Sequence, residues 1–340
     1  MTGEAREAPL CYKPRVRAIL LALLLIVSGC GGFGPSAPQA PPSAVLARLK
    51  VGDAPTLLAA SPDGRRVYAA SNGSISFIDA ATNTVLQTVK DAPNSTGIAV
   101  APNGAKAYVT HLFSIDLTVI DTATDSLDKP VLMFLQRLRG GFGFLAVAPD
   151  NQTIYVANKA NEAFGIIDLT GGPGSLLMPT VFPVDVAISP DGRTVYGAGC
   201  KQICTPGFVQ LYDVPSQKFT QEIEVQGSPY RIVVSPNGAN AYVANLSGPS
   251  ISFIDLATQT VTATVAVPPQ PTGLRISPDG ATLYVASQTA GVLSVVDVAG
   301  TTVRAQLPVY QARDVAVSPD GRRVYVSSND TVLVLDATQL

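Results

Sequence analysis

The chain has no tryptophan and a single histidine, His111, among its 340 residues. Without tryptophan, and with most tyrosines committed to a repeat described below, aromatic platforms that stack on sugars or bases are scarce. One histidine without a nucleophile signature beside it gives little support to a Ser–His–Asp hydrolase. The chain also lacks a glycine-rich phosphate loop, an EF-hand loop and a haem-attachment Cys-x-x-Cys-His. These absences favour a protein without a bound cofactor.

Charge is sparse and nearly balanced. Charged residues make up 14% of the chain, and the formal net charge is −2. Removal of residues 1–29, for the reasons given next, lowers the 25 acidic and 23 basic residues to 23 and 19, a charge of −4. A mildly acidic domain without basic runs binds nucleic acid poorly, so we do not expect nucleic acid as a partner.

The first 44 residues differ in kind from the rest. Basic residues up to Arg17 precede an apolar stretch, residues 18–27, that is too short for a typical spanning helix and indicates a secretory signal. The next residues, Val27-Ser-Gly-Cys30, resemble a bacterial lipobox, which implies cleavage before Cys30 and lipid on that cysteine. The alternatives are an ordinary signal peptide or an uncleaved anchor. Residues 30–44 are rich in glycine, proline, serine and alanine and predict a flexible tether.

This interpretation divides the chain into a lipoprotein signal peptide (1–29), a tether (30–44) and a folded domain (45–340). It predicts export and a lipid anchor, with the domain on the periplasmic or cell-surface side of a membrane. The residue after Cys30 is not Asp, which resembles outer-membrane rather than inner-membrane sorting. We therefore favour the outer membrane if the cell is Gram-negative.

Four cysteines occur, of which Cys11 would leave with the signal and Cys30 is the expected lipid site. Cys200 and Cys204 remain. In an exported protein, a pair separated by three residues favours a small local disulfide. A metal site would need further ligands, and His111 lies two repeats away, so we predict a disulfide and no metal.

One short phrase recurs seven times in the folded domain. It reads Ser/Ala-Pro-Asp/Asn-Gly, with Asn151 in the glycine position of the third copy, and its prolines are Pro62, Pro102, Pro149, Pro190, Pro236, Pro278 and Pro319. Proline presets the first central position of a turn, Asp or Asn suits the second, and Gly or Asn tolerates the positive φ that follows. Intervals of 40–47 residues with strand signals are typical of β-propeller blades. We predict seven blades.

Each repeat carries the signals of four short strands. A tyrosine stands four residues after every glycine position: Tyr68, Tyr108, Tyr155, Tyr196, Tyr242, Tyr284 and Tyr325. The third strand ends in an aspartate: Asp79, Asp121, Asp168, Asp213, Asp255, Asp297 and Asp336. We expect these aspartates to accept backbone N–H groups of the next turn. Residues present in every blade are structural by default.

The last repeat lacks a fourth strand, whereas residues 45–51 form a spare strand before the first repeat. We predict that residues 45–51 complete the seventh blade. Closure of this kind pairs the two free edges of the ring, which would otherwise template aggregation. The predicted fold is therefore an all-β, seven-bladed propeller of four-stranded blades, and we expect a monomer.

Ser-Pro-Asp-Gly, then Tyr-Val-Ala-Asn as at 242–245, then Ile-Asp-x-Ala-Thr resembles the YVTN-type (YncE-like) propeller repeat over about residues 45–340. The resemblance implies the seven-bladed fold, but many members of that family have no defined activity. We favour a binding or scaffolding module at the cell envelope. Related seven-bladed propellers include lactonases, so a lactonase-type hydrolase with its site in the central channel is the alternative, and enzymatic activity is left open.

A functional site is sought among the residues that do not repeat. Aligned on the turn proline, the inner strands carry charge where sibling blades have small or apolar groups: Asp185, Arg231, Arg275, Arg313 and Asp314, with Tyr230 beside them. Buried charge is costly unless paired or solvated. Either a water-filled channel mouth that binds a ligand or an ion-pair network that plugs the channel would accommodate it. The first alternative predicts a ligand site at these six residues for an anionic small molecule, gripped by arginine, or for an envelope protein.

Overall fold

The structure is a computed structural model that describes residues 42–340 except residues 53, 92, 115, 133–141, 159–161 and 173. The predicted signal, the lipobox and the tether up to residue 41 lie outside the described residues. Residues Pro42–Ala44 form a short 3-10 turn, η1. In the described part of the chain, no helix is long and apolar enough to cross a membrane.

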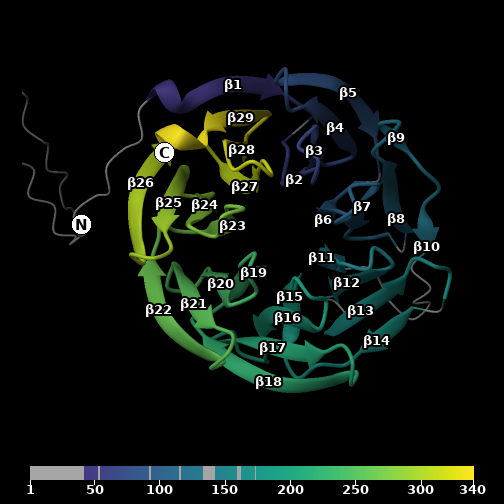
Figure 1. Ribbon diagram of the computed structural model, residues 1–340, viewed down its shortest axis with the longest axis vertical. Helices are drawn as coiled ribbons and strands as arrows, with labels where there is room; N and C mark the ends of the chain where they lie inside the picture. Colours follow the sequence, from purple (N-terminus) through teal and green to yellow (C-terminus); the bar gives the residue numbers. More distant parts are fainter. Residues whose placement is uncertain are drawn as a thin grey trace, which may run out of the picture. The chain divides into compact units, whose positions relative to one another are not determined.

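Seven antiparallel sheets stand as blades in a ring (Figure 1). The first four blades are β2 (Leu57–Ala60), β3 (Arg66–Ser71), β4 (Ser74–Asp79) and β5 (Thr84–Lys90); β6 (Ser95–Val100), β7 (Lys106–His111) and β8 (Asp116–Asp121) with the short β9 (Ser126–Leu127) and β10 (Val131–Leu132); β11 (Phe142–Val147), β12 (Thr153–Asn158), β13 (Ala163–Asp168) and β14 (Ser175–Leu177); and β15 (Phe182–Ile188), β16 (Thr194–Cys200), β17 (Gly207–Asp213) and β18 (Lys218–Val225).

The remaining blades are β19 (Pro229–Val234), β20 (Asn240–Asn245), β21 (Ser250–Asp255) and β22 (Thr260–Ala266); β23 (Pro271–Ile276), β24 (Thr282–Ser287), β25 (Val292–Asp297) and β26 (Thr302–Pro308); and β27 (Ala312–Val317), β28 (Arg323–Ser328) and β29 (Thr331–Asp336) with β1 (Val45–Lys50). A short 3-10 turn, η3 (Ala337–Gln339), follows β29. In each blade the first strand lies innermost, and in blade two β9 and β10 share the outer position beside β8.

The N-terminal strand closes the ring, as predicted. Strand β1 pairs antiparallel with β29, in a register that runs from Val45 opposite Leu335 to Lys50 opposite Thr331. The outermost strand of blade seven therefore comes from the opposite end of the described chain from its three partners. Figure 1 shows the two ends of the described chain side by side at this blade.

The repeated phrase forms the turn between the two inner strands of each blade. In the first copy the Gly64 N–H donates to the Ser61 carbonyl, and Asp63 Oδ1 accepts from the Arg65 N–H at 3.0 Å. Gly64 has φ of 72°, and Asn151 has φ of 58° at the glycine position of the third copy. The conformation predicted for this turn is confirmed, including the substitution of asparagine for glycine.

The apolar core consists of clusters between neighbouring blades rather than one central body. One cluster joins Ile75 and Phe77 of blade one to Ile98 and Val109 of blade two, and equivalent clusters lie at the other six blade boundaries. The seven repeat tyrosines are all buried and belong to this packing. Each blade is thus stabilised by burial against both neighbours, which is why an open ring is disfavoured.

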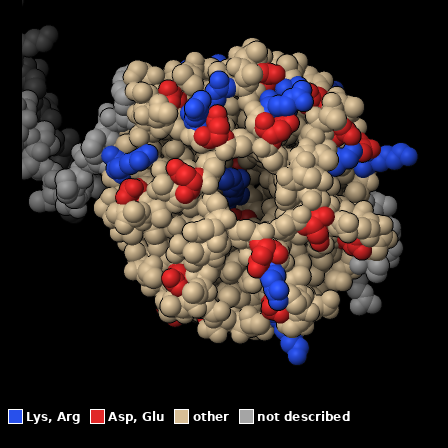
Figure 2. All heavy atoms as spheres, in the orientation of Figure 1, with Lys and Arg blue, Asp and Glu red and all other residues tan. Residues whose placement is uncertain are grey.

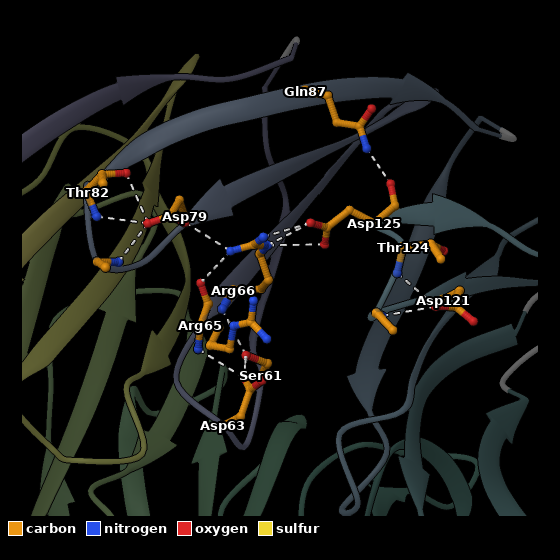
Figure 3. Close-up of polar contacts among 12 residues, drawn as sticks. Ser61, Asp63, Arg65, Arg66, Asp79, Thr82, Gln87, Asp121, Thr124 and Asp125 are labelled. Atoms are coloured by element: carbon orange, nitrogen blue, oxygen red, sulfur yellow. Dashed lines mark hydrogen bonds and ion pairs between the residues drawn. The ribbon is translucent and has the colours of Figure 1, made fainter.

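Polar contacts at the rim add a second link between blades (Figure 3). Asp79, which ends β4, accepts N–H groups of Ala81 and Thr82, as predicted for the strand-ending aspartates. Arg66 on β3 pairs with Asp79 at 3.0 Å and reaches Asp125, in the turn of blade two, at 2.8 Å. One guanidinium therefore connects two blades through two carboxylates.

Candidate functional site

One layer of inner-strand residues crosses the central channel. These residues stand five positions before each turn proline: Leu57, Gly97, Phe144, Asp185, Arg231, Gly273 and Asp314. A Cβ at Gly97 would lie 2.8 Å from the carbonyl oxygen of Gly143, and one at Gly273 would lie 2.8 Å from the Cα of Asp314. The strands therefore approach so closely here that two of the seven positions admit no side chain.

Arg231 links three other members of this layer. Its Nη2 lies 3.2 Å from Asp314 Oδ1, and its Nε lies 3.8 Å from Asp185 Oδ2. Its guanidinium carbon lies 3.9 Å from the centre of the Phe144 ring. The three charged side chains are at most 7% exposed. We call Phe144, Asp185, Arg231 and Asp314 the plug.

Both aspartates of the plug also join adjacent blades. Asp185 Oδ2 accepts the N–H of Ile232 in the next blade at 2.9 Å, and Asp314 Oδ2 accepts the N–H of Leu58 in the next blade at 2.9 Å. Ile232 and Leu58 occupy the same position of their repeats, four residues before the turn proline. The two carboxylates thus make the same inter-blade hydrogen bond at two places in the ring, and both turn toward Arg231.

The protonation of the plug follows from its burial and its pairing. Burial raises the pKa of the Asp185 carboxyl, and the nearby Arg231 opposes that shift. Burial disfavours the charged form of Arg231, but Asp314 and Asp185 outweigh it and raise the pKa of that guanidinium. Arg231 therefore remains a buried cation held between two carboxylates.

The plug lies between two cavities. The turn-side cavity, about 400 Å³, lies along the ends of the inner strands and is lined by Asp185, Arg231 and Arg275. The loop-side cavity, about 480 Å³, lies where the inner strands begin and is lined by Tyr230, Arg313 and Asp314. Phe144 lines both. Figure 2 shows the central opening of one face of the ring, with basic side chains at its bottom and charged side chains around it.

Of the six predicted site residues, Asp185, Arg231 and Asp314 thus belong to the plug, and the other three lie on its two sides. Arg275 Nη2 lies 3.8 Å from Asp314 Oδ2, and its side chain is 27% exposed in the turn-side cavity. On the loop side of the plug, the Tyr230 ring contacts the Phe144 ring edge to face, with ring centres 5.6 Å apart. Arg313 stands apart, because it forms no ion pair with any described residue.

A backbone irregularity explains this distribution. In six of the seven inner strands the pairing register shifts near the strand start, for example between Pro229 and Arg231 and between Ala312 and Val315. A β-bulge re-aims the side chain of the extra residue. Tyr230 lies in one such shift, and both Arg313 and Asp314 lie in another; Tyr230 and Arg313 line the loop-side cavity, whereas the residues that follow them form the plug.

Phe144 belongs to the site but was absent from the predicted set. Its signal in the sequence is that it is the only aromatic residue in the layer five positions before the prolines. Aromatic faces attract guanidinium groups, and this attraction strengthens where water is excluded. The presence of Phe144 in the same layer as Arg231 would therefore have indicated that the ring stacks on the guanidinium.

Cys200, Cys204 and His111 line neither cavity of the channel. Cys200 and Cys204 are joined by a disulfide at the end of β16, with Cα atoms 4.7 Å apart. His111 is buried at the end of β7, where Nε2 lies 2.9 Å from Thr118 Oγ1, and burial lowers its pKa. Among the described residues, no group of three or more His, Cys, Asp or Glu residues is arranged to hold a metal ion.

Comparison with known proteins supports the fold. No protein-family model matches the chain, and no curated protein matches it. A chain of the Kuenenia stuttgartiensis hydrazine synthase is similar in structure, with a TM-score of 0.75 and 20% sequence identity. The match covers 84% of this chain and 97% of that one. At this identity the likeness shows the propeller fold alone.

Proposed function

We propose that the protein is an exported, lipid-anchored propeller of the YVTN type that binds a ligand in its loop-side cavity. The observation that carries the proposal is the contrast between the arginines of the channel. Arg231 lies between the two carboxylates of the plug, whereas Arg313 lines an open cavity without an acidic partner among the described residues. A cavity that is mainly apolar with a few convergent polar groups is the usual form of a ligand site.

The hydrolase alternative is less well supported by the same geometry. A channel metal would require Asp185 and Asp314, but their oxygens accept backbone N–H groups and face Arg231. A cation would therefore have to displace Arg231 from both carboxylates. Metal-dependent turnover of lactones that is lost in Asp185→Ala would favour the hydrolase instead.

The test fills each cavity in turn with a phenylalanine side chain introduced on the same strand. Thr96 and Ala99 both lie on β6, but Thr96 lines the loop-side cavity and Ala99 lines the turn-side cavity. Compounds from an envelope extract are screened by thermal shift against wild type, Thr96→Phe and Ala99→Phe. We expect ligands that raise the Tm of wild type and of Ala99→Phe but not of Thr96→Phe. Ligands unaffected by Thr96→Phe would contradict the proposed site.

The location has its own test. Cys30→Ala should block lipidation and release the protein from membranes, because the proposed anchor depends on that thiol. Fractionation of cells that express wild type and the variant measures this. Unchanged retention and processing would contradict the lipid anchor and leave the cavity proposal intact.

A further inference from the structure

The channel carries one unmatched positive charge. The charged residues that line its two cavities are Asp185, Arg231, Arg275, Arg313 and Asp314. Three arginines against two aspartates leave a charge of +1. Arg231 lies between both aspartates, and Arg275 lies 3.8 Å from Asp314. The excess charge therefore belongs to Arg313.

Arg313 is held so that its guanidinium has unused hydrogen-bonding capacity. Its backbone carbonyl accepts from Thr272 Oγ1 at 2.9 Å, which fixes the strand beside the cavity. Its Nε is buried and has no hydrogen-bond partner among the described residues. A buried N–H without a partner is costly, and an anion that accepts from it removes that cost.

The surroundings of Arg313 suit a small anionic group. The loop-side cavity is lined by the hydroxyl-bearing residues Thr56, Thr96 and Tyr230 and by the apolar side chains of Leu57 and Val184. Apolar walls lower the local dielectric and strengthen the attraction between an anion and a guanidinium. The Thr56 and Thr96 hydroxyls donate to Ala70 and Thr110, so the Tyr230 hydroxyl is the neutral donor left for a ligand. The site is thus matched to an anion of a single negative charge.

A second hollow lies beside this cavity. It has a volume of about 550 Å³ and is lined by Thr289, Pro308, Tyr310 and Gln311. Gln288 lines both this hollow and the loop-side cavity, so the two are neighbours. Tyr310 is 70% exposed. Side-chain amides that pair with peptide groups, next to an exposed aromatic ring and a proline, suit an extended polypeptide.

We propose that the loop-side cavity captures the free C-terminal carboxylate of an extended peptide, whose preceding residues lie over Gln288 beside Tyr310. The planar fork of Arg313 matches a carboxylate, which carries one charge, better than it matches a dianionic phosphate in a channel with an excess of one charge. This inference rests on the proposed function, since it names the ligand class of the same cavity. It assigns Arg313 to the carboxylate and Tyr310 to the chain.

The experiment uses the folded domain and a library of random octapeptides displayed with free C-termini. Selected peptides are synthesised as free acids and as C-terminal amides, and their affinities are measured by fluorescence anisotropy. We expect amidation and Arg313→Gln each to weaken binding by about 10- to 100-fold, the range for loss of a charged hydrogen bond. Arg65→Gln, an exposed arginine in the first repeat turn, is the matched control and should leave the affinity unchanged.

A second variant separates the two parts of the site. Tyr310→Ala should weaken binding of the octapeptides but not of N-acetylglycine, which fills only the loop-side cavity. Equal affinity for the acids and the amides would overturn the proposal, and so would displacement of the peptide by inorganic phosphate at lower concentration than by acetate. If compounds without a carboxylate bind and Thr96→Phe blocks them, the proposed function stands and the peptide inference fails.

Discussion

The guanidinium of Arg231 stacks on the ring of Phe144, 3.9 Å from its centre, at the middle of the channel. The same group faces Asp185 and Asp314, so a single side chain contacts residues from three other blades. Because Leu58 and Ile232 donate their N–H groups to these aspartates, the contacts continue into the backbone of the ring. The plug is therefore part of the framework of the propeller and separates its two cavities.

Replacement of Arg231 by alanine should destabilise the fold. It leaves buried Asp185 without a cation and Asp314 with only Arg275 at 3.8 Å, and removal of one partner from a buried pair typically costs about 3–5 kcal/mol. Arg275→Ala should cost less, because that side chain is 27% exposed and 3.8 Å from Asp314. Denaturant unfolding of both variants measures the difference. Equal free energies of unfolding for wild type and Arg231→Ala would contradict the structural role of the plug.

Arg66→Ala should weaken the link between blades one and two. The variant loses charged hydrogen bonds to Asp79 and Asp125, and we expect a loss of about 1.5–3 kcal/mol in the free energy of unfolding. Arg65→Ala is the matched control, because Arg65 is the adjacent residue and its side chain is exposed. This substitution should change the free energy of unfolding by less than about 0.5 kcal/mol. Urea unfolding of the pair decides. A similar loss in both variants would show that total charge, rather than this link, matters.

Deletion of residues 42–50 should open the ring. Without β1, the edge of β29 loses its backbone partner and becomes a template for pairing with another chain. We expect a lower Tm and dimers or larger species in size-exclusion chromatography with light scattering. A monomer with unchanged Tm would contradict the closure by β1.

Stability should fall in acid. Hydrogen bonds lower the pKa of most turn aspartates. The pKa of Asp121 is lowered to about 2, chiefly by a hydrogen bond from Lys106 and next by hydrogen bonds from Thr124. In acid the folded state then binds fewer protons than the unfolded chain, whose aspartates have a pKa of about 3.9. Their contribution is therefore complete above about pH 4 and is lost as pH falls toward the folded pKa values. Asp185 acts in the opposite direction, because its pKa is raised.

The check for the pH dependence is the urea midpoint at pH 5 and at pH 2.5. The midpoint should be lower at pH 2.5, and Asp121→Asn should reduce the difference between the two values. A midpoint that rises on acidification would mean that Asp185 outweighs the turn aspartates.

The fold was predictable because its signals are local and repeated. The turn around Asp63 and Gly64 depends on four consecutive residues, and the same residue types recur at every blade. The spare strand at 45–51 was recognisable because the last repeat ends after three strands. Pairing of β1 with β29 confirms this prediction, with the strand ending at Lys50 rather than at residue 51.

The site was predictable only to the level of position along a strand. Alignment on the prolines brought Arg231 and Asp314 into one layer, but they are 83 residues apart, and nothing local fixes the direction of either side chain. The register shift beside Arg313 has no sequence signal, so its assignment to the loop-side cavity required the structure. The contact between Arg66 and Asp125 escaped prediction because the residue after Ile-Asp-x-Ala-Thr varies between blades, as Asn83, Asp125 and Gln259 show.

Closure by β1 also has a mechanical consequence. The chain that precedes residue 42 enters the ring directly through η1 and β1, whose register with β29 runs from Val45 to Lys50. Any tension on the N-terminal segment therefore acts on β1 before it reaches another blade. A ring that is pulled from this end would yield first at β1, and the force that the protein bears is set by one strand pair.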